Sequence, residues 1–374
     1  MTNKGLFSIL LVVLAALSAD LAGQSARDSN SAIPPEKRPA EEVYRNIQVL
    51  KGVPAEQLVL AMNAIAGSLG VDCDYCHENN FNEDNLPAKI KARQMIRMTR
   101  QINQQNYPAQ AAVTCFTCHQ GQSTPPVIPL LRPPESVAQI AQAKPEAESL
   151  PTVSQLLDRY VQVLGGQKAL NNIKTRILKT ASVDPASKEF ADIFVKAPGK
   201  VLHVKQSGAY STYAGFNGKQ AWQYDSAKSY WGLLDLGQRI TLIQESELYP
   251  GSRLRSDYSQ LAVLGKDKIG ERDVYVLDGV SPEDAHERFF FDAGSGLLLR
   301  RRTEQLSIFG LVPVQEDFED YRRVDGVEVP FVTQWSSFRS FGIGFHSARR
   351  ILEVHQNVEI PDEKFNPPAD ASGS

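Results

Sequence analysis

The sequence predicts a multidomain protein, in which a mainly α domain is followed by an α+β domain with a curved antiparallel sheet. Helical periodicity dominates residues 54–103, whereas short strand-like runs separated by turn residues fill most of the chain after residue 174. Between these regions, residues 121–134 contain five prolines, which exclude a helix interior or a central strand and indicate a boundary. A chain of 374 residues is long enough for two domains with separate cores.

The first 24 residues predict a secretory signal peptide. Lys4 precedes an apolar run over residues 6–17, which is too short to span a membrane comfortably. An uncleaved membrane anchor is the alternative interpretation. The rest of the chain is predicted to divide into a disordered lead-in (25–40), a first domain (41–134), a linker (135–150) and a second domain (151–370).

The composition is that of a soluble globular protein. Hydrophobic residues make up 42% of the chain, charged residues make up 22%, and the net charge is −3. No basic run with interleaved aromatic residues is present in the sequence, so nucleic acid is excluded as a partner.

Two longer helices are predicted in the first domain. Residues 54–69 place Leu58, Met62, Ile65 and Leu69 in one apolar stripe, and Gly70 is a helix-ending residue. Residues 87–103 form the second helix. Its apolar residues are Ile90, Met95, Met98 and Ile102, and Lys89 and Arg93 lie on other faces.

The second domain is predicted to begin with two helices, over residues 151–164 and 167–173. Strand-like runs follow, several of them joined by tight turns such as Asn217-Gly218. A further helix over residues 236–249 is inserted among them. Such a pattern predicts an antiparallel sheet with helices at its start. The basic run Arg300-Arg301-Arg302 is interpreted as a solvated strand end.

All four cysteines lie in two motifs of the form C-x-x-C-H: Cys73, Cys76 and His77, then Cys115, Cys118 and His119. This motif attaches c-type haem. Two thiols at this spacing can form thioethers with the vinyl groups on one porphyrin edge, and the adjacent histidine can ligate the iron. The sequence therefore predicts two covalently attached c-type haems, with His77 and His119 as proximal ligands.

Zinc binding and thiol redox chemistry are the other interpretations of the motifs. A pair of C-x-x-C sequences can bind zinc, but zinc does not require a histidine directly after each second cysteine. A redox dithiol or a local disulfide would leave both histidines unexplained.

Methionine is the natural candidate for the sixth iron position. Apart from Met1, the methionines are Met62, Met95 and Met98, and all three lie in the helices that precede the motifs. A thioether there gives a six-coordinate iron suited to electron transfer, whereas an open position admits a small ligand. Core filler is the alternative role. Met95 and Met98 share a face, so periodicity does not choose between them.

The pattern Ser68-Leu69-Gly70 before the first motif, Ile96-Arg97-Met98 in the second helix, and Cys115 to Gly121 resembles the cytochrome c subunit of photosynthetic reaction centres. In that family a helix precedes each C-x-x-C-H motif and typically supplies a methionine to the iron. The resemblance covers roughly residues 41–134. It implies that Met62 ligates the first haem and Met98 the second, with Met95 in packing. Well-known members carry four haems in two such halves, and this chain has one half.

The second domain resembles, in pattern only, the half-barrel of periplasmic lipoprotein-sorting carriers. Phe318, Tyr321 and the Asp325-Gly326 turn fit a strand, turn, strand unit of such a sheet. The resemblance implies that the concave face could hold an apolar ligand. A structural or docking domain is the alternative.

These observations predict a periplasmic or exported two-haem c-type cytochrome that carries electrons and is not an enzyme. Its expected partners are redox proteins, including a membrane-bound electron-transfer complex at the outer face of the inner membrane. Two alternatives remain open. The first is a peroxidase-like two-haem enzyme with one open iron, and the second is a lipid- or lipoprotein-binding protein with a haem redox module.

Overall fold

The computed structural model describes residues 37–108, 112–126, 150–187, 189–207, 210–226, 230–232, 234–282, 284–337 and 345–367. The predicted signal peptide, nearly all of the lead-in and the linker up to residue 149 lie outside the described residues. In the part of the chain that is described, no helix is both long enough and apolar enough to cross a membrane.

The described residues from 37 to 126, here called the helical segment, contain four α-helices and one 3₁₀ turn. They are α2 (Ala40–Val43), α3 (Ala55–Leu69), η2 (Cys73–Tyr75), α4 (Pro87–Asn106) and α5 (Cys115–His119). Both longer predicted helices are confirmed. Gly70 ends α3 in the left-handed conformation, with φ of +65°, which glycine adopts without steric cost.

The buried face of α4 differs from the apolar stripe of the sequence. Lys89, Arg93, Ile96 and Thr99 are its buried residues, whereas Ile90 is 48% exposed. The two cations can be buried because the preceding loop supplies their hydrogen-bond acceptors. Lys89 Nζ donates to the carbonyl of Phe81 at 2.9 Å, and Arg93 pairs with both carboxylate oxygens of Asp84 at 2.8 Å.

The described residues from 150 to 367, here called the sheet segment, begin with α7 (Val153–Val163) and α8 (Gln167–Asn172). Thr152 and Gln155 form a reciprocal capping box at the start of α7. One side of α7 is buried, as its periodicity predicts, and packs on the sheet through Leu156, Leu157 and Tyr160.

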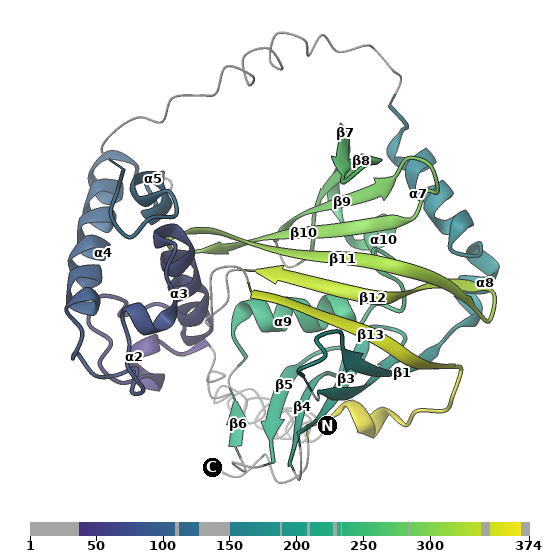
Figure 1. The fold of residues 1–374 in the computed structure, drawn as a ribbon, viewed down its shortest axis with the longest axis horizontal. Coiled ribbons are helices and arrows are strands. Elements are labelled where there is room, and N and C mark those ends of the chain that lie inside the picture. The colour runs from purple at the N-terminus through teal and green to yellow at the C-terminus, as the bar shows by residue number, and fades with distance from the viewer. Residues whose placement is uncertain are drawn as a thin grey trace, which may run out of the picture.

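Thirteen described strands form one large curved antiparallel sheet, which confirms that part of the predicted fold class (Figure 1). Their order across the sheet is β6-β5-β4-β3-β2-β1-β13-β12-β11-β10-β9-β8-β7. The strands are β1 (Thr175–Ser182), β2 (Phe190–Lys196), β3 (Lys200–Ser207), β4 (Tyr210–Phe216), β5 (Ala221–Asp225), β6 (Tyr230–Gly232), β7 (Ser259–Ile269), β8 (Arg272–Val280), β9 (His286–Asp292), β10 (Leu298–Ser307), β11 (Gly310–Val324), β12 (Val327–Ser337) and β13 (Phe345–Gln356).

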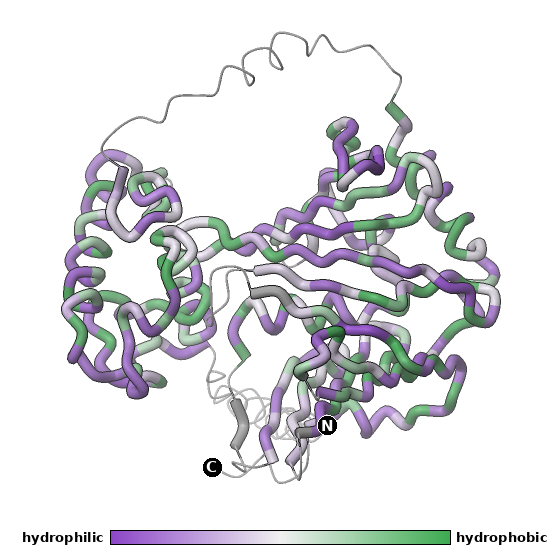
Figure 2. The backbone as a smooth tube through the Cα atoms, in the orientation of Figure 1, coloured by the Kyte–Doolittle hydropathy of each residue, from purple (hydrophilic) through white to green (hydrophobic). Residues whose placement is uncertain are grey.

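The inserted helix is confirmed as α9 (Leu236–Glu245), and it lies against one face of the sheet (Figure 1). Its apolar residues Ile240 and Leu242 are buried. Two short elements complete the segment, α10 (Leu254–Asp257) and η3 (Asp362–Phe365). The tube coloured by hydropathy shows apolar and polar residues alternating along many of the strands, as expected for a sheet whose two faces differ in burial (Figure 2).

The interpretation of Arg300-Arg301-Arg302 as a solvated strand end is wrong for its central residue. Arg301 is 3% exposed, and its Nε donates to Glu316 at 3.1 Å. Glu287, which is 1% exposed, lies near the same guanidinium. Period-two alternation along β10 places Arg301 on the inner face of the sheet, so burial of the guanidinium requires carboxylate partners.

Candidate haem-binding site

The first motif forms a tight turn directly after α3. The amide of His77 donates to the carbonyl of Cys73 at 2.9 Å, and the amide of Cys76 donates to the same carbonyl at 3.2 Å. The backbone therefore makes one helical turn between the two cysteines. Residues three apart on such a turn lie on the same side, so both thiols can reach one edge of a planar group.

The second motif is the helix α5. The side chain of Thr114 accepts a hydrogen bond from the amide of Thr117 and, together with the Thr117 hydroxyl, forms a capping box that fixes where this short helix begins. The Nδ1 atom of His119 lies 2.9 Å from the carbonyl of Gln122. With the proton on Nδ1, this hydrogen bond orients the ring and leaves Nε2 as the atom that can ligate a metal.

The end of α3 contacts Gly121, which lies two residues after the second motif. The amide of Gly121 donates to the carbonyl of Ser68 at 2.9 Å. A Cβ atom at Gly70 would lie 2.1 Å from the carbonyl oxygen of Gly121, so only glycine fits. Because Gly70 precedes Cys73 by three residues, this contact brings the two motifs together.

None of the four cysteines forms a disulfide. Burial raises the pKa of the Cys76 thiol, and it raises the pKa of the Cys115 thiol to about 11. Both groups are therefore protonated thiols at neutral pH. Within the described residues, no group of three or more His, Cys, Asp or Glu side chains is arranged to hold a metal ion.

The loop after the first motif is held against α4 by charge. Burial, followed by the nearby Lys89 ammonium, lowers the pKa of His77, so its imidazole is neutral. Neutral imidazole is the form that ligates a metal. The centres of the Phe81 and His77 rings lie 5.0 Å apart. The backbone carbonyl of Phe81 accepts the hydrogen bond from Lys89. The Arg93 guanidinium holds the pKa of the Asp84 carboxyl well below its usual range.

The three candidate methionines differ in burial. Met62 is partly buried and packs from α3 against the apolar cluster of the helical segment. Met95 is also partly buried, whereas Met98 is 43% exposed on α4. A methionine that ligates a haem needs an open approach to the ring, so the exposure of Met98 agrees with the role that the family resemblance implies. Ligation of the second haem by Met98 stays a prediction.

The surroundings of the motifs fit a large apolar group. Large apolar side chains are normally buried, and several that are exposed lie within or beside the two motifs. They are Tyr75 and Phe116 within the motifs and Phe81 beside His77, and Ile90 and Met98 of α4 are exposed as well. A porphyrin attached to the thiols would cover surface of this kind. A c-type haem requires two thiols, a histidine and an apolar surface. The thiol spacing and the oriented His119 meet the first two requirements, and these exposed side chains meet the third.

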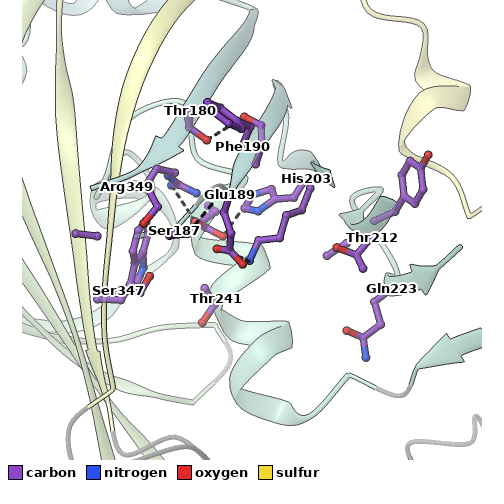
Figure 3. A pocket seen from close by; sticks show the side chains of 18 of the residues that line it. Thr180, Ser187, Glu189, Phe190, His203, Thr212, Gln223, Thr241, Ser347 and Arg349 are labelled. Carbon is purple, nitrogen blue, oxygen red and sulfur yellow. Dashed lines mark hydrogen bonds and ion pairs between the residues drawn. The ribbon is translucent and has the colours of Figure 1, made fainter. Parts of the chain in front are cut away.

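A second candidate site lies in the sheet segment, between the sheet and α9, as a cavity of about 1060 Å³. Figure 3 shows His203 and Arg349 approaching one another from β3 and β13, with Thr212 and Gln223 on the other side of the space. Glu245 of α9 joins the first two: its carboxylate lies 3.4 Å from His203 Nε2 and 3.1 Å from Arg349 Nη2.

The lining of this cavity is mixed. Four aromatic residues, Phe190, Tyr213, Tyr224 and Trp335, stand among hydroxyl and charged side chains. The Arg349 guanidinium lies over the Trp335 ring, 4.5 Å from its centre. Burial lowers the pKa of His203, because desolvation outweighs the attraction of Glu245. The sequence around His203 carries no motif that marks it as part of a site. No local pattern could have found Glu245 and Arg349, which lie far from it in the chain.

A helical segment with two C-x-x-C-H turns, joined to an antiparallel sheet, defines a protein with a cytochrome c module. The family model described as "Photosynthetic reaction centre cytochrome C subunit" matches residues 14–187. The photosynthetic reaction center cytochrome c subunit of Roseobacter denitrificans is 35% identical over 97 residues, which are 23% of this chain and 26% of that protein. Cytochrome c-554 of Chloroflexus aurantiacus is 43% identical over 81 residues, 20% of each chain.

The predicted resemblance of the haem module is thereby confirmed. The chain spans about a quarter or less of the length of these curated relatives. Solved structures similar to the sheet segment include a LolA superfamily protein from Nitrosomonas europaea, with a TM-score of 0.39 and 15% identity over 58% of this chain and 99% of that chain. A DUF1329 family protein from Desulfovibrio piger gives a TM-score of 0.40 and 12% identity over 57% and 97%.

Proposed function

We propose that this chain is a two-haem c-type cytochrome that carries single electrons between redox proteins. The observation that carries the proposal is the local geometry of the second motif: one capped helical turn presents Cys115, Cys118 and His119 together, and the Gln122 carbonyl orients the histidine. The first motif repeats the turn with Cys73, Cys76 and His77. The named relatives are cytochromes, which supports covalent c-type haem in this segment.

In this proposal each cysteine pair holds one haem and each motif histidine is its proximal ligand. Met62 and Met98 are the distal ligands, so that both irons are six-coordinate. A bound haem supplies one-electron chemistry at its iron. The chain contributes fixed ligands, an apolar cover and nearby charge. Lys89 and Arg93 stand close to His77, and positive charge there disfavours the oxidised iron, so we expect them to raise the potential of the first haem.

The proposed setting is the periplasm or the cell exterior, because c-type haem is attached outside the cytoplasm in bacteria. Proposed partners are redox proteins, including a membrane-bound complex at the outer face of the inner membrane. The proposed division keeps a cytochrome domain over residues 41–134 and a sheet domain over residues 151–370. Ala40 is already buried in α2, so the compact part begins slightly before the first of these boundaries.

The proposal is tested by intact mass measurement of the full chain expressed with the haem-attachment machinery. We expect the mass of the polypeptide plus two haems. Replacing Cys73 and Cys76 together with alanine should remove one haem, and replacing Cys115 and Cys118 should remove the other. A double variant that still carries two haems would refute the assignment of its motif.

Carbon monoxide separates the carrier from the peroxidase-like alternative. A six-coordinate ferrous haem with a methionine ligand does not bind carbon monoxide promptly, whereas an open iron does. We therefore expect the optical spectrum of the reduced protein to stay unchanged after the gas is added. A prompt change in one haem would favour the enzyme.

The cavity of the sheet segment supports a second candidate function, the binding of a small molecule beside the redox module. Its volume is large enough for a molecule of cofactor size. The sequence suggested an apolar ligand, but the imidazole of His203 and the charged groups of Glu245 and Arg349 line the space together with aromatic rings. We therefore propose an amphipathic ligand, with an apolar body against the aromatic residues and a polar group near the ion pairs.

A further inference from the structure

The hairpin of β10 and β11 reaches from the sheet to the helical segment (Figure 1). Phe309 is one of the two residues at its turn, where side chains usually face solvent, yet it is 3% exposed. Val312 is buried equally. Both belong to one apolar cluster with Leu60 of α3 and Ile96 of α4. The hairpin is therefore part of the core of the helical segment.

The tip of this hairpin lies against the residue that directly precedes the second motif. Gly310 has a φ of +126°, and a Cβ atom there would lie 3.2 Å from Cγ2 of Thr114. Thr114 is the capping residue of α5, and Cys115 packs against the same apolar cluster as Phe309. No residue of the first motif is among the described members of that cluster. The hairpin therefore contacts the second motif in particular.

The helix α9, like the hairpin, joins the sheet segment to α3. Leu236, at the start of α9, packs against the same cluster. Arg239 Nη1 lies 2.7 Å from Glu56 Oε2, and Lys37 Nζ lies 2.9 Å from the other oxygen of this buried carboxylate. A buried carboxylate with cations on both oxygens is held in one place. The sheet segment is thus anchored to α3 by an ion pair beside the apolar contact.

This inference rests on the proposed function. We propose that the β10–β11 hairpin is a positioning element for the second haem. Phe309 and Gly310 hold Thr114 and Cys115, so that α5 presents its thiols and His119 in one orientation and water is kept from that side. The potential of a haem depends on its burial, because the oxidised iron carries an additional charge that water stabilises. Loosening the hairpin should therefore lower the potential of the second haem.

The test uses the full haem-loaded chain and the substitution Phe309→Ala. A redox titration followed optically gives the potential of each haem, and the variants that lack one cysteine pair assign them. We expect both haems to be retained by mass, and the potential of the second haem to fall by more than that of the first. Met62 packs against the same cluster, so a smaller change at the first haem is consistent with the proposal.

Two variants serve as controls. Phe309→Leu keeps an apolar side chain at the tip and should restore most of the wild-type potential. Leu306→Ala changes the same hairpin at a side chain that is 68% exposed, and it should leave both potentials unchanged. If Phe309→Ala does not fold, the test uses Gly310→Ala, which adds a methyl group at the Thr114 contact. The expected result is again a larger fall in the potential of the second haem than of the first.

Equal shifts of both haems, or no shift of either, would overturn the positioning role. The two-haem assignment would survive that result, because intact mass reports haem number independently. A wild-type chain with fewer than two haems would instead refute the proposed function.

Discussion

Glu247 gives the sheet segment a group that titrates near neutral pH, and its replacement tests the effect of burial. The residue follows α9 and is partly buried. Burial raises the pKa of Glu247 to about 7, against the opposing attraction of Arg301 and with a smaller contribution from Glu287. One carboxylate oxygen accepts a hydrogen bond from the amide of Ser252 at 3.1 Å. The folded protein therefore holds a proton on this side chain that the unfolded chain releases.

The sign of the effect on stability follows from this difference. In the unfolded chain the group titrates near 4.5, so the raised folded pKa means that protonation favours folding. Its contribution is fully present below about pH 4.5 and is lost as the pH rises through about 7. A shift of this size corresponds to about 3 kcal/mol in the free energy of unfolding. Because Glu247 is partly open to solvent, we expect about 2 kcal/mol in practice.

The test is Glu247→Gln, which has the same shape, does not titrate, and can still accept the hydrogen bond from Ser252. Urea unfolding followed by circular dichroism gives the free energy of unfolding at pH 5 and pH 8. The free energy of unfolding of the variant minus that of wild type should be about 2 kcal/mol larger at pH 8 than at pH 5. Glu271→Gln, at an exposed turn, is the matched control. A difference between Glu247→Gln and wild type that is the same at both pH values would refute the argument.

Two further predictions concern the two sites. Met98→Ala should change the potential of the second haem strongly and Met95→Ala should not, as measured by optical redox titration; the reverse result would make Met95 the ligand. In the cavity, Ala191→Trp fills space beside the aromatic residues and should weaken binding of a fluorescent fatty acid by about tenfold or more, equivalent to about 1.4 kcal/mol. Equal binding by this variant and by wild type would place the probe elsewhere.

Much of the helical segment could be predicted from the sequence because its signals are local. A helix forms through hydrogen bonds between residues four apart, so apolar spacing and Gly70 were enough to predict α3 and its end. The C-x-x-C-H motifs depend on residues that are neighbours in the chain, so their geometry could be anticipated too. The turns at Cys73 and Cys115 follow that expectation, and the haem ligands themselves remain predictions.

Burial was predicted less well, because it depends on what covers a residue. The buried face of α4 carries Lys89 and Arg93, since the loop before the helix supplies carbonyls and a carboxylate to them. Arg301 is buried for the same reason, with Glu316 from the neighbouring strand as its partner. A sequence pattern ranks such cations as exposed, and only their partners reverse that preference.

The sequence by itself determined the motif chemistry and the order of helices and strands. The tertiary structure alone decided which distant residues meet. It placed Phe309 in the core around α3 and Gly310 against Thr114, and it brought Glu245 between His203 and Arg349. Covalent spacing and backbone hydrogen bonds act over a few residues. Contacts between segments far apart in the chain follow from how the sheet curves and how the helical segment packs on it, which no local pattern encodes.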